Sequence, residues 1–130
     1  MILILYIIIA LVGSIQDIRT RTVSNLIHIC VILISLPNIS TSNILGGILG
    51  YVVFIAPNFI IKGGMGGADI KFMFASGLLL GVHRIEIAIV VGLILAVVTN
   101  KFINLLFNKN ENEIPLIPYL AIGCIFSYLI

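Results

Sequence analysis

The chain carries very little charge. Only 9% of its 130 residues are Asp, Glu, Lys or Arg, and tryptophan is absent. A soluble domain has about 25% charged residues, whereas here 61% of the residues are hydrophobic and the mean hydropathy is +1.28. The composition therefore predicts an integral membrane protein with a single domain over residues 1–130. The net charge is only +2 and the basic residues are scattered along the chain, so the sequence does not predict a nucleic-acid-binding surface.

Residues that bind metals are also scarce. The two cysteines, Cys30 and Cys124, each lie alone in an apolar stretch without a CxxC pair, so we interpret them as packed thiols and exclude a structural zinc site. We interpret His28 as a packed or hydrogen-bonded core residue. Neither His28 nor His83 forms a convincing catalytic set with a serine. We expect no metal and no cofactor.

Polar clusters divide the apolar sequence into six segments. Crossing the hydrocarbon core takes about 20 helical residues, with a range of about 17–25. The second and fourth segments have only about 14 residues each, but we expect them to cross because a re-entrant course would scramble the charge distribution described below. The first segment has no Lys or Arg ahead of it, so we expect a retained helix and not a secretory signal. The sequence thus predicts an all-α membrane protein, a bundle of about six transmembrane helices at about residues 1–16, 23–36, 43–61, 69–81, 85–107 and 118–130.

The basic residues predict the orientation of this bundle. With six crossings, six of the seven basic residues fall on one side and only Arg84 on the other. The positive-inside rule makes the six-residue side cytoplasmic and places both the N-terminus and the C-terminus outside. That side holds Arg19, Arg21, Lys62, Lys71, Lys101 and Lys109.

Two aspartates, Asp17 and Asp69, are the only ones in the chain, and both fall at predicted cytoplasmic ends of helices. Asp69 follows a glycine-rich stretch within residues 62–71, where four glycines indicate a bend or a close backbone approach. A single carboxylate there is explained equally well as a helix cap or an interfacial anchor. Two carboxylates brought together instead share a proton and can activate a water, as in aspartic proteases.

Four segments, in order, resemble the type IV prepilin and preflagellin peptidases, membrane aspartic proteases with a Gly-x-Gly-Asp motif. The segment 64–71 reads Gly-Met-Gly-Gly-Ala-Asp-Ile-Lys, and 75–81 resembles the small-residue helix that follows the motif. The segment 114–123 resembles the family's Ile-Pro-x-x-Pro-x-Leu-Ala-x-Gly sequence. Asp17, Arg19, Val23 and Asn25 match an Asp-x-Arg/Lys pattern that leads to an apolar-Pro-Asn triplet.

The resemblance implies an aspartic endopeptidase of the cytoplasmic membrane that faces the cytoplasm. Its implied catalytic residues are Asp17 and Asp69. Its implied substrate is a prepilin-like or preflagellin-like precursor with a short basic leader, a glycine before the cut and an apolar helix after it. The supporting or substrate-contacting candidates are Gly64, Gly66, Gly67, Lys71, Arg19 and Asn25.

The sequence departs from the family pattern in three places. Ala68 replaces a motif glycine, which would strain the backbone if that position needs a positive φ. Ser24 replaces a proline. The cytoplasmic insertion with two CxxC pairs found in larger members is not seen, so we expect peptidase activity without methyltransferase activity.

Two alternatives belong to other classes of protein. A small multispan transporter would place an acidic residue near mid-membrane, where it binds a coupling ion. No acid falls there in the predicted spans, which disfavours this reading. A non-catalytic assembly subunit for pili or secretion would use the glycine stretch only as a turn. The oligomeric state is left open.

Overall fold

A computed structural model describes residues 1–61, 66–107 and 115–130 of the chain. In this part of the chain every regular element is helical. The elements are α1 (Ile2–Thr20), α2 (Asn25–Ser35), the 3-10 turn η1 (Leu36–Asn38), α3 (Thr41–Ile60), α4 (Gly67–Leu80), α5 (Val82–Phe107) and α6 (Ile117–Leu129).

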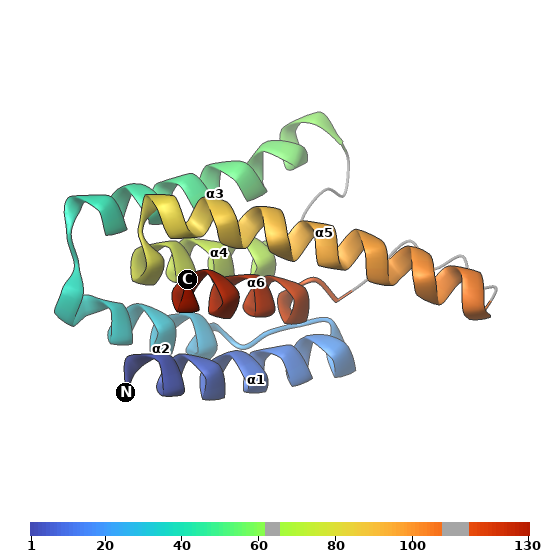
Figure 1. Ribbon diagram of the computed structural model, residues 1–130, viewed down its shortest axis with the longest axis horizontal. Helices are drawn as coiled ribbons and strands as arrows, with labels where there is room; N and C mark the ends of the chain where they lie inside the picture. The colour runs from blue at the N-terminus through green and yellow to red at the C-terminus, as the bar shows by residue number, and fades with distance from the viewer. Residues whose placement is uncertain (62–65, 108–114) are drawn as a thin grey trace.

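The helices alternate in direction along the bundle (Figure 1). Helix α4 packs against α2, α3, α5 and α6, while α1 packs against α2 and α6. The two chain termini lie at the same end of the bundle (Figure 1). At the opposite end α1, α3 and α5 finish and α2, α4 and α6 begin; we call it the aspartate end, because Asp17 and Asp69 belong to these helix ends.

The outward surface is apolar, as a lipid-facing surface must be. Along α1, the exposed side chains Ile4, Ile8, Leu11 and Ile15 form a ridge in which each is more than half exposed. Helices α1, α3 and α5, with 19, 20 and 26 residues, are long and apolar enough to cross a membrane. Helices α2 with η1 and α6 are shorter apolar helices. Helix α4 has 14 residues and so spans only about 21 Å. The prediction of an all-α membrane bundle with six helices is confirmed.

Two helix boundaries differ from the predicted ones by three residues or more. Asp17 was expected in a turn, but α1 continues to Thr20 because nothing between residues 16 and 20 breaks a helix; it ends where Arg21 adopts the left-handed conformation, φ 54°. Helix α5 begins three residues earlier than expected. Gly81, at φ 85°, ends α4 abruptly, and the Val82 N–H donates to the Ser42 hydroxyl at 3.4 Å.

Glycines bring the backbones of α3 and α4 into close contact. A Cβ added at Gly46 would lie 2.6 Å from the carbonyl carbon of Gly81, and one at Gly50 would lie 2.6 Å from the carbonyl oxygen of Met73. A Cβ at Gly77 would collide with the backbone of Gly46. Helix association in lipid depends on close packing of small residues, since lipid tails are as apolar as side chains. These glycines are therefore required by the packing, beyond ordinary usage of glycine in membranes.

A buried polar contact joins α4 to α1. The hydroxyl groups of Tyr6 and Ser76 are 2.9 Å apart, and both residues are almost fully buried. Asn43 of α3 adds a second contact, donating through Nδ2 to the Leu78 carbonyl at 2.7 Å. Hydrogen bonds of this kind contribute about 0.6 kcal/mol on average between membrane helices, so they fix the register of α4 more than they add stability.

We predict that Gly77→Ala destabilises the folded bundle. Alanine gains about 1 kcal/mol in helix propensity over glycine, but the collision with Gly46 is between backbones and cannot be relieved by a side-chain rotation. Overpacking typically costs about 1–3 kcal/mol, so the net change is a loss of stability. Thermal unfolding of the purified protein in detergent measures it. Gly67→Ala is the matched control, because a Cβ there meets nothing within 4 Å; equal melting temperatures for the two variants would contradict the proposed contact.

Candidate active site

Asp17 is buried at the C-terminal end of α1, with 6% of its surface exposed. Its Oδ2 accepts a hydrogen bond of 3.1 Å from the backbone N–H of Ile117, the first residue of α6. The first N–H groups of a helix lack partners within that helix and carry a partial positive charge. Arg21 also acts electrostatically on the Asp17 carboxyl group. The acid is therefore held by the start of a helix that lies 100 residues further along the chain.

Asp69 lies in the first turn of α4 and is partly buried. Gly66 is the N-cap of this helix, and its backbone N–H donates a hydrogen bond to the Asp69 carboxyl group. A side chain at the third helical position that reaches back to the N-cap N–H is half of a capping box. Gly66 and Gly67 thus form the start of α4, and the Asp69 carboxyl group reaches back to the N-cap of this helix.

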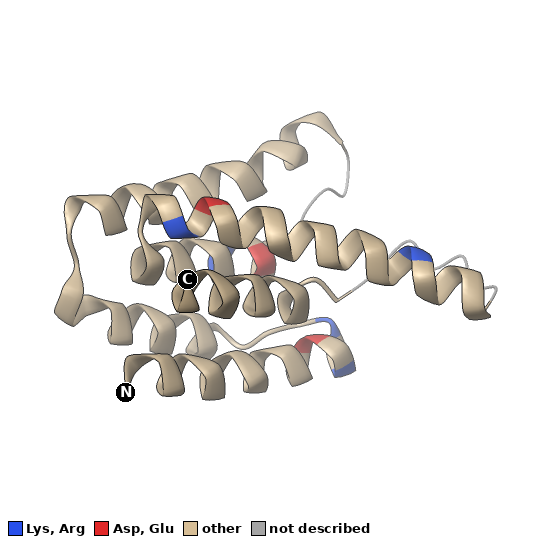
Figure 2. Ribbon diagram, in the orientation of Figure 1, with Lys and Arg blue, Asp and Glu red and all other residues tan. Residues whose placement is uncertain are grey.

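The structure places Asp17 and Asp69 at the same end of the bundle. Their carboxyl groups interact electrostatically. Figure 2 shows acidic positions on both α1 and α4 at this end of the bundle, where the first turn of α6 lies beside them. Backbone N–H groups from α4 and α6 converge on the pair, one on each carboxyl group.

Of the motif glycines Gly64, Gly66 and Gly67, the structure describes the last two. Gly64 lies outside the described residues. Gly66 has φ −65° and Gly67 is the first residue of α4, so neither uses a conformation reserved for glycine. Ala68 is the second residue of the same helix, and Arg21 is the one described non-glycine residue with positive φ. The expectation that Ala68 could strain the backbone is therefore wrong, because this position is helical.

The remaining supporting candidates lie apart from the two acids. Arg19 is exposed in the last turn of α1. Lys71 donates through Nζ to the Oδ1 atom of Asn25 at 3.1 Å, which joins α4 to the start of α2. Lys71 follows Asp69 by two residues, or about 200° around a helix, so the two side chains leave α4 on opposite faces. Ser24, which stands in place of proline, is the N-cap of α2 and accepts a hydrogen bond from the Leu26 N–H at 3.3 Å.

Two features were missed by sequence reasoning. The hydrogen bond from Ile117 to Asp17 has a signal in the sequence, since Pro115 and Pro118 mark a helix start, but nothing there identifies its partner. His28 is buried, as expected, yet neither of its ring nitrogens has a hydrogen-bond partner in the described part of the chain.

Cys124 is buried and Cys30 half-buried, and both are free thiols. Within the described ranges no three His, Cys, Asp or Glu residues cluster in a way that could hold a metal ion.

A helical membrane bundle with two acids converging at one end is an architecture suited to intramembrane proteolysis. The type IV leader peptidase family model matches residues 4–107 of this chain. The chain belongs to this family and is a type IV leader peptidase-like protease, a hydrolase. No curated protein and no solved structure matches it. The matched range includes both aspartates and ends with α5, so the resemblance of residues 114–123 rests on the sequence motif itself.

We predict that the amide of Ile117 exchanges faster when Asp17 cannot accept its hydrogen bond. Asp17→Asn keeps an acceptor oxygen, whereas Asp17→Leu leaves the N–H buried without a partner. Such a loss is worth about 1–3 kcal/mol, which corresponds to about 5-fold to 150-fold in the opening equilibrium at this site. Amide exchange of the first turn of α6 measures it. Identical exchange in the Leu and Asn variants would show that the contact contributes nothing.

Proposed function

We propose that the protein is an aspartic endopeptidase whose catalytic dyad is Asp17 and Asp69. The observation that carries this proposal is the burial of Asp17 at the C-terminal end of α1, where it interacts electrostatically with a second carboxyl group. An anion near a helix C-terminus opposes the helix dipole, and burial adds a desolvation penalty. A residue that breaks both local preferences is expected chiefly at functional sites.

The chemistry follows from two carboxyl groups that share one proton. The ionised group takes a proton from a water, and the protonated group donates its proton to the carbonyl oxygen of the scissile peptide bond. The water oxygen then bonds to the carbonyl carbon. When this tetrahedral intermediate collapses, the C–N bond breaks and the amine leaves with the proton that the dyad took from the water. The other carboxylate takes a hydroxyl proton from the intermediate, which restores the proton shared by the dyad. The N–H donors of Gly66 and Ile117 support the ionised forms of the two acids.

The location of the dyad suits a prepilin-like precursor. In such a precursor the bond to be cut joins a short basic leader to an apolar membrane helix, so it lies at the membrane surface. Both acids belong to helix ends at one side of the bundle. The positive-inside rule favours the cytoplasm on that side, because Arg19 and Arg21 lie at the end of α1 and Lys101 lies on the far part of α5 (blue in Figure 2).

We predict that Asp17→Asn and Asp69→Asn each lower cleavage of a co-expressed prepilin-like precursor by at least a hundredfold, since general acid–base groups contribute about 10²–10⁴-fold. Both variants keep an acceptor for their backbone N–H donors. Processing is measured by the mobility of the precursor on gels, and purified components give the rate. Glu86→Gln is the matched control, because Glu86 is exposed near the opposite end of the bundle. Wild-type processing by either aspartate variant would refute the dyad.

We predict that chelators leave the peptidase activity unchanged, since the proposed reaction uses two carboxyl groups and a water. The purified protein is assayed on the precursor before and after incubation with EDTA and with a zinc-specific chelator. Loss of cleavage that added zinc restores would assign the reaction to a metal. Failure of the wild-type protein to cleave any precursor would instead support a non-catalytic assembly subunit.

A further inference from the structure

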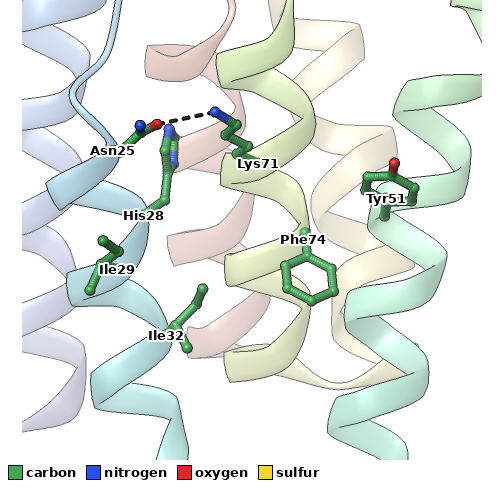
Figure 3. A pocket seen from close by; sticks show the side chains of 7 residues that line it. All are labelled: Asn25, His28, Ile29, Ile32, Tyr51, Lys71 and Phe74. Atoms are coloured by element: carbon green, nitrogen blue, oxygen red, sulfur yellow. Dashed lines mark hydrogen bonds between the residues drawn. The ribbon is translucent and has the colours of Figure 1, made fainter.

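A groove of about 430 Å³ lies between α2, α3 and α4. Figure 3 shows its lining side chains, which approach from three helices. Its volume falls in the usual range for ligand pockets, about 300–1,000 Å³. The lining residues are Asn25, His28, Ile29, Ile32, Tyr51, Lys71 and Phe74.

One end of the groove is arranged to receive an anion. The Lys71 ammonium and the Asn25 amide are hydrogen-bonded there at 3.1 Å, and the His28 ring points toward them (Figure 3). His28 is 4% exposed, and neither Nδ1 nor Nε2 has a partner among the described residues. None of the seven described lining residues is acidic. The first turn of α2 adds the partial positive charge of a helix N-terminus. The imidazole can donate an N–H that has no acceptor among the described residues, and the Lys71 ammonium group supplies a positive charge next to it.

The rest of the groove is apolar and opens toward lipid. Ile29 and Ile32 line it from α2, Phe74 from α4 and Tyr51 from α3. Ile29 is 51% exposed and Tyr51 is 43% exposed on the outer surface of the bundle. Along α2 the polar positions come first and the apolar ones follow, so the groove has a charged mouth at the aspartate end and an apolar floor that runs toward mid-membrane. A lipid has the same order of polar and apolar parts.

We propose that this groove binds an anionic phospholipid. The phosphate lies at Lys71, Asn25 and His28, and an acyl chain lies along Ile29, Ile32 and Phe74. Lys71 is two residues from Asp69 and leaves α4 on the opposite face, so an occupant here does not cover the dyad. The apolar part of the groove is continuous with the polar end at Lys71 and Asn25, which suits an acyl chain attached to a phosphate. The proposal does not depend on peptidase activity.

Native mass spectrometry of the full chain tests the site. The protein is titrated with phosphatidylglycerol and with phosphatidylcholine that carries the same acyl chains. Wild-type protein is expected to retain phosphatidylglycerol with about a tenfold preference, the effect of about 1.4 kcal/mol from one charge-assisted contact. Lys71→Gln is expected to reduce this preference to near parity. Ile29→Trp, which fills the apolar part, is expected to weaken the binding of both lipids at least tenfold.

Lys101→Gln is the matched control. Lys101 is also an exposed lysine of the aspartate end, on α5 and outside the groove, so this variant is expected to keep the wild-type preference. Equal retention of the two lipids by wild-type protein, or an unchanged preference in Lys71→Gln, would overturn the proposal. Displacement of bound phosphatidylglycerol by a precursor-derived transmembrane peptide, one for one, would also overturn it and assign the groove to the substrate.

Discussion

The close contact between the backbones of α3 and α4 determines where the rest of the site can lie. Burial in lipid supplies little force between apolar helices, so position depends on shape and on a few polar contacts. Gly46, Gly50 and Gly77 let the two helices approach until backbone meets backbone. Asn43 then fixes the C-terminal end of α4, and Tyr6 fixes its middle through Ser76. With both held, the first turn of α4 is fixed at the end of the bundle where α1 carries Asp17.

The sequence predicted the six helices because hydropathy and polar clusters report directly on what faces lipid. It did not predict that Asp17 is helical, because a charged cluster after an apolar run is read as a turn although none of its residues breaks a helix. It left open whether Ala68 needs a positive φ, since glycine is found both in strained loops and at ordinary helix starts. The contact between Asp17 and Ile117 could not be predicted from the sequence because it depends on how α1 and α6 pack. The groove at His28 likewise exists only once α2, α3 and α4 are assembled.

The helix dipole favours one of the two acids and disfavours the other. Asp69 stands where an acid stabilises a helix, at its N-terminus, and caps a backbone N–H. A purely structural role accounts for it fully. Asp17 stands where an acid destabilises a helix, near its C-terminus, and is also buried. The free-energy cost of burying Asp17 there is offset in part by the hydrogen bond from the Ile117 N–H at the start of α6. The position of Asp17 therefore carries the argument for a functional site. Asp69 is assigned to the same site because it interacts electrostatically with Asp17.

Helix α4 presents a different chemistry on each of two faces. Asp69 faces α1 and α6, where the proposed reaction takes place, and Lys71 faces α2, where the proposed lipid phosphate binds. Because the helix is short, about 21 Å, its ends cannot both reach the two membrane surfaces unless the bilayer is locally thinned. A lipid anchor at Lys71, two residues from Asp69, would set the depth of this proposed catalytic acid relative to the phosphates. A peptide bond at the membrane surface has its own depth set by the same phosphates, so a lipid held at Lys71 would align enzyme and substrate to one common reference plane.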